Sequence, residues 1–363
     1  MSKQFPWDNY SDQPHILKRE DKKTLRKGYG LDYFKLIATN LFYFPYLFFK
    51  FILKLVGSIL SNKNRNHIST FDKIEPTGFY GLSLNLDKGE EQYELVEELG
   101  IKSLQIRVFL NDIQNIDNYV TFVKGFGTDK EILITIIQDR EHIENHELLR
   151  KNINTIFKKF KGVANEFQIG NAINRIKWEF VSMEEYLAFY EMVQKVRDKY
   201  FPNIKLIGSS VIDFEYHFSI RTLFNNFKIH YDKFSTLLYV DRRGSPYSTQ
   251  MGIFDFKNKI EFLDTIVKTS KKSENSIYIT EANWPLSNTI PYAPTSEKEC
   301  VSEDVYCQYM LEYFDIALKT NKIEKIFWHQ LIAPGYGLVD NRDDKICKTK
   351  AFYAFKTLLE KTD

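Results

Sequence analysis

A carboxylate closes one apolar segment of this 363-residue chain. Residues 277–280 are β-branched or aromatic and carry no charge, as a buried strand requires, and Glu281 follows them directly. Asn283, Trp284 and a chain-breaking Pro285 come just beyond. A carboxylate presented at the end of a buried strand is suited to act as a nucleophile or a general base. Because an isolated Thr-Glu pair is also common in ordinary loops, this segment alone does not establish catalysis.

Seven further apolar segments end in polar side chains of similar kinds. They offer amides, carboxylates, arginines and aromatic rings: Asn85, Asp87, Arg107, Asn111, Asp112, Gln138, Asp139, Arg140, Asn171, Asp213, Glu215, Tyr239, Asp241, Arg242, Arg243, Trp328, His329 and Gln330. Such groups hold sugar hydroxyls, and aromatic rings stack on the apolar faces of pyranoses. We expect a carbohydrate site built from Arg107, Asp139, Asn171, Tyr239, Arg242, Asn283, Trp284, Trp328, Gln330 and Tyr336.

The elements that must position these groups alternate along the chain as strand and amphipathic helix, the pattern of a parallel sheet wound with helices. The expected strands are residues 79–84, 103–109, 132–138, 166–170, 204–209, 236–241, 276–281 and 325–330. The expected helices are residues 90–99, 117–126, 146–160, 183–200, 220–226, 256–270, 305–320 and 350–361. Eight pairs in about 290 residues match a (β/α)8 TIM barrel, whose functional groups lie at the carboxyl ends of the strands. A doubly wound sheet is the alternative, but no glycine-rich phosphate loop follows the first strand.

Other chemistries have weaker support in the sequence. No His/Cys/Asp cluster has zinc spacing and no Gly-x-Ser-x-Gly elbow occurs, while His217, His230 and His329 are isolated, so we expect no metal and no other cofactor. The body lacks the basic aromatic platform of a nucleic-acid-binding protein, so no nucleic-acid partner is expected. The three cysteines form no metal spacing and no even disulfide framework, which favours a reducing compartment.

Three segments carry a resemblance to a known family. Residues 167–178 (FQIGNAINRIKW), 279–285 (ITEANWP) and 327–340 (FWHQLIAPGYGLVD) resemble the large clan of retaining (β/α)8 glycoside hydrolases, whose two catalytic glutamates end strands four and seven. The resemblance covers the body from Pro76 onward. Within the clan, the chain resembles bacterial cell-envelope glycosidase-like proteins. It implies that Glu281 is the nucleophile, that Asn171 binds the sugar 2-hydroxyl, and that Arg107 and Trp328 support the site.

One position departs from the family pattern. The residue after Asn171, where the resemblance implies a glutamate acting as general acid and base, is Ala172. Retaining hydrolysis needs two carboxyl groups about 5–5.5 Å apart, and a methyl group donates no proton. Another carboxyl can supply the acid, with Glu215, Asp241 and Asp139 best placed by strand order. Otherwise the leaving group needs little acid help, or the site binds glycans without cleaving them; an engineered Glu-to-Ala change would give the same sequence.

Several of these segments also have simpler interpretations. Asp241 and Arg242 can form a structural salt bridge, and Asp213 can cap the helix that follows it. Residues 334–337 have the composition of a turn, which would place Tyr336 at the wall of the sugar site. Residues 287–303 exceed an ordinary strand-to-helix connection, so we expect them to form a lid over the cleft.

The amino-terminal region differs from the body in charge. Residues 1–66 hold 12 basic and 5 acidic side chains, which leaves 38 and 43 for the remainder of the chain. Within this arm, residues 33–57 are rich in aromatic and aliphatic side chains, and Lys50 and Lys54 lie one helical turn apart. The uncharged run 36–49 is short for a transmembrane span and includes Pro45. We expect an interfacial helix pair on an anionic membrane surface; the alternative is a helical hairpin packed on the body or on a membrane protein partner. Residues 58–70 read as a linker.

The sequence therefore predicts two parts, a membrane-associating arm and linker (residues 1–66) and a glycosidase-like barrel (residues 67–363). The first hypothesis is a glycoside hydrolase or transglycosidase, held at the cytoplasmic face of the inner membrane, that acts on a lipid-linked or cell-envelope saccharide such as a lipopolysaccharide or capsule precursor. Its catalytic residues would be Glu281 with Glu215 or Asp241. The second hypothesis is a catalytically inactive glycan-binding subunit or pseudoenzyme that supports a membrane partner, and Ala172 favours it.

Overall fold

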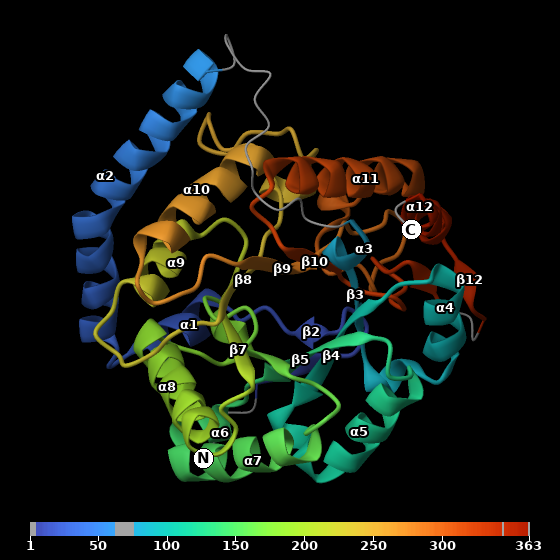
Figure 1. Ribbon diagram of the computed structural model, residues 1–363, viewed down its shortest axis with the longest axis horizontal. Helices are drawn as coiled ribbons and strands as arrows, with labels where there is room; N and C mark the ends of the chain where they lie inside the picture. Colours follow the sequence, from blue (N-terminus) through green and yellow to red (C-terminus); the bar gives the residue numbers. More distant parts are fainter. Residues whose placement is uncertain (1–4, 62–75, 343–344, 362–363) are drawn as a thin grey trace.

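The structure is a computed structural model that describes residues 5–61, 76–342 and 345–361, apart from the side chains of residues 59–61, 76–77 and 242. Its centre is a closed barrel of eight parallel strands, in which the last strand pairs with the first (Figure 1). In barrel order these strands are β3 (Tyr80–Leu84), β4 (Ser103–Phe109), β5 (Glu131–Ile137), β6 (Glu166–Ile169), β7 (Lys205–Ile212), β8 (Lys233–Leu237), β9 (Ile277–Ala282) and β10 (Lys325–Trp328). The (β/α)8 prediction is confirmed.

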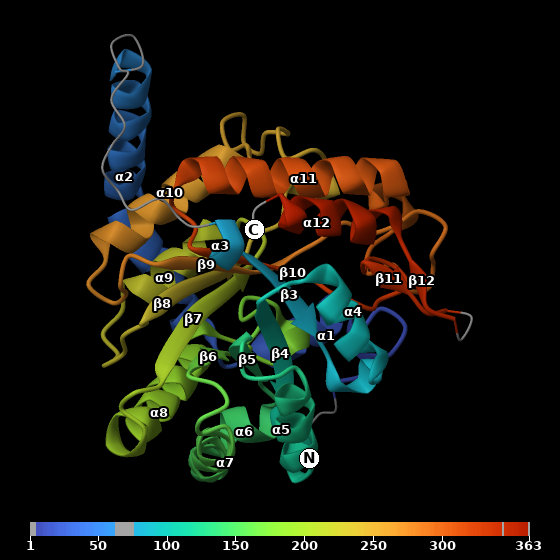
Figure 2. The same ribbon diagram turned by 45° about the vertical axis from the view of Figure 1, so that its right-hand side comes forward.

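Helices surround the barrel (Figures 1 and 2). They are α3 (Pro76–Phe79), α4 (Glu91–Leu99), α5 (Ile116–Gly125), α6 (Arg140–Glu144), α7 (His146–Lys159), α8 (Met183–Tyr200), α9 (Tyr216–Leu223), α10 (Phe256–Thr269), α11 (Glu303–Thr320) and α12 (Lys350–Glu360). The longer ones begin at polar caps, since the side chains of Ser182, Asp255 and Ser302 each accept a hydrogen bond from a backbone N–H of the first turn. These caps explain why the sequence marks the helix starts well.

The barrel interior is filled by side chains and is not a channel. Leu133, Ile207, Tyr278 and Phe327, from β5, β7, β9 and β10, form a buried cluster inside the barrel, separate from the core between strands and helices. Such layers close TIM barrels from within. A ligand therefore meets the barrel only at one of its two ends.

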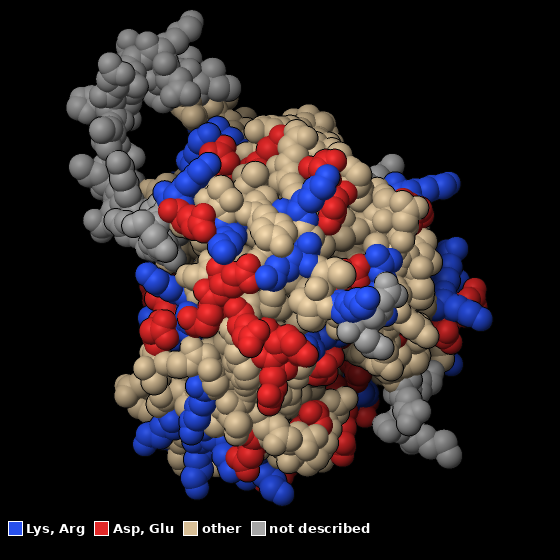
Figure 3. All heavy atoms as spheres, turned by 90° about the vertical axis from the view of Figure 1, so that its right-hand side faces the viewer, with Lys and Arg blue, Asp and Glu red and all other residues tan. Residues whose placement is uncertain are grey.

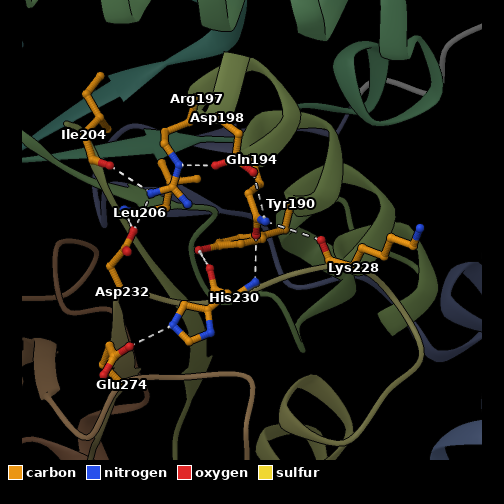
Figure 4. Close-up of polar contacts among 10 residues, drawn as sticks. All are labelled: Tyr190, Gln194, Arg197, Asp198, Ile204, Leu206, Lys228, His230, Asp232 and Glu274. Atoms are coloured by element: carbon orange, nitrogen blue, oxygen red, sulfur yellow. Dashed lines mark hydrogen bonds and ion pairs between the residues drawn. The ribbon is translucent and has the colours of Figure 1, made fainter. Parts of the chain in front are cut away.

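The end of the barrel where the strands begin is held by ion pairs (Figure 4). Arg197, near the end of α8, donates from Nη1 to Asp232 over 2.6 Å and to the Ile204 carbonyl over 2.9 Å. Asp232 also accepts from the Leu206 backbone N–H over 2.7 Å, so one carboxylate ties β7, the start of β8 and α8 together. In TIM barrels this face serves stability, whereas the opposite face carries function.

Residues before the barrel form a short hairpin and two helices. The hairpin joins β1 (Trp7–Asp8) to β2 (Gln13–Pro14), and α1 (Arg19–Arg26) and α2 (Gly30–Ser61) follow. In Figure 1 the dark-blue hairpin lies across the middle of the ring of strands, and α2 runs along one side of it beside α9 and α10. A further two-stranded sheet, β11 (Val339–Asp340) with β12 (Cys347–Lys348), precedes α12.

The helix α2 docks on the barrel through one face only. Leu36, Leu47 and Phe51 are buried in the main core, and Phe51 stacks on Phe254 at 5.6 Å. The opposite, outer face of α2 is exposed and apolar, and consists of Phe34, Leu41, Phe42, Tyr46, Phe49 and Leu53. From Gly30 to Ser58 this helix is long and apolar enough to cross a membrane, and among the described residues no other helix meets that test.

Three predicted elements differ clearly from the structure, among them the helix expected at residues 220–226, which is α9 (Tyr216–Leu223). Residues 33–57 lie in one continuous helix and not in a helix pair, with Pro45 inside it. A proline lacks the N–H of one helical hydrogen bond, and the packing of both halves of α2 on α8, α9 and α10 keeps the helix continuous. Strand β8 begins and ends earlier than expected, which leaves Tyr239 and Asp241 in the loop beyond it. Most of the predicted linker 58–70 lies outside the described residues.

Candidate active site

Glu281 lies near the carboxyl end of β9, half-buried in the mouth of the barrel. The Tyr239 hydroxyl, two residues beyond β8, donates to its Oε1 over 2.7 Å. Burial, and secondly the negative charge of Glu281, raise the pKa of Tyr239 well above its usual value, so its hydroxyl stays a donor at neutral pH. The Arg243 guanidinium lies 3.2 Å from the centroid of the Tyr239 ring and holds that ring from its other side. Glu281 is therefore an oriented carboxylate.

Two basic side chains stand near this carboxylate. Arg107, from β4, is buried; burial acts to lower its pKa, but the charges of Asp12, Tyr336 and Glu281 outweigh that and raise it. His329 follows β10, and burial lowers its pKa to about 4 although Glu281 acts in the opposite direction. At neutral pH the site thus holds the Arg107 cation beside a neutral imidazole.

Two buried amides have unused hydrogen-bonding capacity. Asn171 is fixed by Gln138, which accepts from its backbone N–H over 2.9 Å and donates to its carbonyl over 2.8 Å, while its Nδ2 has no protein acceptor. Asn283 donates to the His329 carbonyl over 2.8 Å, while its Oδ1 has no protein donor. Buried polar atoms without a partner are costly, and ligand hydroxyls satisfy such groups.

Ala172 occupies an apolar environment. It is fully buried with a φ of 45°, and it clusters with Ile137, Trp178, Leu237 and Tyr239. Trp7 and Phe109 pack against the same cluster. The position that the sequence resemblance assigns to the acid is therefore apolar, and the Ala172 side chain offers no proton.

The three carboxyl groups expected to replace that acid are engaged or displaced. The Glu215 carboxylate accepts from Arg175 over 2.6 Å and from Asn174 over 2.7 Å. Asp139 caps α6 and contacts the His142 ring over 2.7 Å. Asp241 lines a separate cavity of about 330 Å³, which it shares with Glu215, Tyr239 and Arg175. Glu215 and Asp241 therefore lie together, in a cavity whose lining includes Tyr239, the partner of Glu281.

Two ionisable side chains on the β6–α8 loop were not predicted. Burial, and secondly the charge of Asp139, raise the pKa of Glu179 to about 7. Burial lowers the pKa of Lys177 to about 8, although Glu281 acts in the opposite direction. Both belong to the β6–α8 loop that also carries Ala172, and both hold a proton for part of the time near neutral pH. No sequence pattern marks these two side chains, because burial, not residue type, sets their pKa values.

The remaining predicted residues divide between the mouth and the core. Gln330 and Tyr336 lie together at the mouth, with Gln330 Nε2 donating to the Tyr336 hydroxyl over 2.9 Å. The two tryptophans instead stack on each other 5.9 Å apart, and Trp328 donates to the Tyr306 hydroxyl of α11 over 2.8 Å. Since both rings are buried in the core against α11, neither offers a sugar platform. The side chain of Arg242 is outside the described part of the chain.

The hairpin at the amino terminus lies in the barrel mouth. Trp7 makes edge contacts with Phe109 at 5.6 Å and Trp178 at 5.7 Å, and Gln13 accepts from Lys177 over 2.6 Å. A cavity of about 630 Å³ adjoins the hairpin and is lined by both the hairpin and the strand ends, including Arg107 and Glu179. Residues 287–303, predicted as a lid, contact the hairpin through Tyr292 and the Pro294 carbonyl.

This closed parallel barrel with a carboxylate at its seventh strand end has the fold of glycoside hydrolases. No family model and no curated protein matches the sequence. Among solved structures, the chain is similar to a family 1 β-glucosidase from Thermotoga maritima (TM-score 0.59, 10% identity, 80% of this chain and 99% of that chain). It is also similar to that β-glucosidase in complex with glucoimidazole (TM-score 0.60, 11% identity, 80% and 99%) and to the virulence factor SghA from Agrobacterium tumefaciens (TM-score 0.58, 9% identity, 78% and 97%). At these identities the likeness defines the fold alone.

Proposed function

We propose that the protein is a membrane-peripheral, glycosidase-like barrel that binds a lipid-linked or cell-envelope saccharide, with Glu281 as the nucleophile that meets the anomeric carbon. The observation that carries the proposal is the oriented Glu281 carboxylate, held by Tyr239 at the carboxyl end of β9. A nucleophilic carboxylate has to be fixed in direction, and the hydrogen bond from the Tyr239 hydroxyl fixes Glu281. The unpartnered amides of Asn171 and Asn283 are suited to sugar hydroxyls.

Proton donation to the leaving group is the step that this site supplies least well. Lys177 and Glu179 lie on the same loop as Ala172 and hold a proton for part of the time near neutral pH, and the charge of Glu281 acts on Lys177. We propose that Lys177 or Glu179 donates the proton to the leaving group of substrates that need acid catalysis. Without either, only a sugar with a good leaving group is cleaved, since general acid catalysis contributes about 10²–10⁴-fold.

The membrane part of the proposal rests on the outer face of α2. Its exposed aromatic and aliphatic side chains form one stripe, while the inner face is fixed to the barrel by packing and by ion pairs such as Lys54 with Asp264 over 2.8 Å. A helix bound in this way suits the headgroup boundary better than a span surrounded by lipid. The basic segment before α2 suits the anionic lipids of a cytoplasmic leaflet.

The charge of the barrel supports the same orientation. Figure 3 shows acidic side chains gathered on the face that carries α4, where Asp87, Glu90, Glu91, Glu94 and Glu97 are exposed. In Figure 1, α4 and α2 lie on opposite sides of the barrel. If α2 lies on an anionic membrane, the acidic face is turned away from it, so electrostatic repulsion is small.

The second candidate function is a catalytically silent glycan-binding subunit that supports a membrane partner. The observation that favours it is the apolar packing of Ala172, which closes the usual acid position with hydrocarbon. The two functions share the sugar site and differ in whether Glu281 forms a covalent bond.

The test uses full-length protein on anionic phospholipid vesicles and a panel of 2,4-dinitrophenyl 2-deoxy-2-fluoroglycosides, whose leaving group needs no acid. A working nucleophile is expected to give a fluoroglycosyl adduct on the peptide that contains Glu281, detected by mass spectrometry. Glu281→Gln should abolish the adduct, and the matched control Glu215→Gln, a carboxyl paired with Arg175, should keep it. Saturable glycan binding without an adduct from any sugar of the panel would establish the silent subunit instead.

A second experiment distinguishes the effect of a missing general acid from the effect of the nucleophile. In Ala172→Glu, the hydrolysis of alkyl glycosides, which need an acid, is expected to rise by about 10²–10⁴-fold, whereas dinitrophenyl glycosides should change little. An equal change with both leaving groups would mean that Ala172 does not stand at the acid position.

A further inference from the structure

The barrel mouth holds a carboxylate that belongs to the chain itself. Asp12, in the hairpin turn, has a φ of 52° and points its carboxylate at the strand ends. Its Oδ2 accepts from Arg107 Nη2, from Asn85 Nδ2 over 3.1 Å and from Gln330 Nε2 over 3.1 Å. The donors come from the ends of β4, β3 and β10, elements far apart in the sequence. One carboxylate oxygen thus accepts hydrogen bonds from a guanidinium and from two side-chain amides.

These donors are also held by hydrogen bonds within the barrel that do not involve Asp12. Arg107 Nε donates to Asn85 Oδ1 over 2.7 Å, and Asn85 in turn donates to Gln330 Oε1. The Gln330 amide also donates to Tyr336, so the network is built by the barrel and the hairpin adds only the carboxylate. The Arg107 side chain is 4% exposed and pairs with Asp12. Without Asp12 it would keep its hydrogen bond to the neutral Asn85, while Glu281 and Asp87 would act on its charge without a direct ion pair among the described residues.

The rest of the hairpin is attached by contacts that can be exchanged. Gln13 accepts a hydrogen bond from Lys177 and donates one to the Pro294 carbonyl. Trp7 makes an edge contact with Trp178, and Tyr10 makes an edge contact with Tyr292 at the surface. Its turn is held from within, since Asp8 accepts from the Tyr10 N–H over 3.0 Å and from the Ser11 hydroxyl over 2.6 Å. The hairpin can therefore leave as a unit and keep its own shape.

We propose that Arg107, Asn85 and Gln330 form a carboxylate-binding subsite, which Asp12 fills in the free protein, and that an acidic saccharide displaces the hairpin to bind there. This rests on the proposed sugar-binding function and adds the substrate class, a sugar that carries a carboxylate. The sugar carboxylate takes the place of Asp12, and the adjoining cavity of about 630 Å³ accepts the rest of the ligand as the hairpin moves out. A neutral sugar lacks the group that competes with Asp12.

The experiment measures the affinities of methyl β-glucuronide and methyl β-glucoside by titration calorimetry with the full-length protein. In Asp12→Asn, both ligands gain access, and the glucuronide should bind at least tenfold more tightly than the glucoside. That preference should disappear in the double variant Asp12→Asn/Arg107→Gln. Asp21→Asn, which removes an exposed carboxylate of α1, is the control and should behave as the unchanged protein. Equal affinities for the two ligands in Asp12→Asn would overturn the carboxylate subsite.

Hydrogen exchange in the unchanged protein gives a second measure. Saturating glucuronide should speed exchange of the backbone amides in residues 7–15, and glucoside at the same concentration should not. Glucuronide binding that leaves these amides protected would overturn the displacement. If Asp12→Asn does not fold, Trp7→Ala loosens the hairpin with Asp12 retained and should bind glucuronide more tightly than the unchanged protein does. The fluoroglycosyl adduct at Glu281 needs no sugar carboxylate, so failure of this subsite is distinguishable from failure of the proposed function.

Discussion

The two faces of α2 can be separated by a matched pair of phenylalanine substitutions. Phe42 lies on the outer face with 76% of its surface exposed, whereas Phe51 lies on the inner face and is fully buried between Phe254 and Phe262. If the outer face enters the membrane boundary, Phe42→Ala should weaken vesicle binding and leave the fold intact. Phe51→Ala should destabilise the fold and leave vesicle binding unchanged.

The magnitudes follow from burial. Full burial of a phenylalanine is worth about 2 kcal/mol, and the exposed 76% of Phe42 corresponds to about 1.5 kcal/mol, or about a tenfold loss in vesicle partitioning. Removing the buried Phe51 ring leaves a cavity and should lower the free energy of unfolding by about 3–5 kcal/mol. Exposed apolar side chains contribute little to stability, so Phe42→Ala should change it by less than about 0.5 kcal/mol.

Two assays check the pair, co-sedimentation with vesicles that contain anionic lipid and urea unfolding without lipid. Phe49→Ala, on the same outer face with 60% exposure, is a replicate of the first effect. Unchanged sedimentation of both outer-face variants would refute membrane contact through this face. An unfolding free energy of Phe51→Ala within about 1 kcal/mol of the unchanged protein would refute the docking of α2 on the barrel.

Three further predictions concern stability, pH and catalysis. Arg197→Ala leaves Asp232 without its buried partner and should lower the free energy of unfolding by about 3 kcal/mol, measured by urea titration. Folding raises the pKa of Glu179 from 4.5 to about 7, so the folded state binds the proton more tightly than the unfolded state does. The resulting contribution to the free energy of unfolding is fully present below about pH 4.5 and is lost as the pH rises to 7. It amounts to at most about 3 kcal/mol. Relative to the unchanged protein, Glu179→Gln should therefore gain up to about 3 kcal/mol in the free energy of unfolding between pH 5 and pH 8, and an unchanged difference between the two proteins over this range would refute the assignment. Tyr239→Phe removes the donor to Glu281 and should slow formation of the fluoroglycosyl adduct about tenfold to hundredfold, followed by mass spectrometry; an unchanged rate would mean that this hydrogen bond does not orient the nucleophile.

The barrel could be predicted from the sequence because its information is local. Each strand is a short run with aliphatic or aromatic side chains, and many of the helices have an apolar stripe and a polar cap. The predicted ranges for β4 and α8 therefore equal the observed ones. The position of Glu281 at a strand end followed from the same pattern. Strand β8 was placed too late because Tyr239 and Val240 continue its apolar composition after its pairing ends.

Side-chain direction could not be predicted in this way. Trp284 and Trp328 stand near strand ends, as sugar platforms do, yet both rings are buried beside α11. A shift of one residue along a strand moves a side chain from the mouth to the core, and the sequence does not fix that choice where both sides are apolar. The partners of Glu215 and Asp139 are likewise set by the fold, since Arg175 and His142 are ordinary residues by type.

The largest difference concerns the amino-terminal region, and it changes how Ala172 is understood. Its charge and apolar content predict a membrane arm, and nothing in residues 5–16 predicts a segment inside the barrel mouth. Yet Trp7 packs on the cluster that contains Ala172, and Asp12 binds Arg107. A glutamate at position 172 would bring a carboxylate into the apolar contact of Trp7, at a cost in desolvation. The small apolar residue at position 172, where the sequence resemblance implies a proton donor, is therefore compatible with the hairpin that packs on the same cluster.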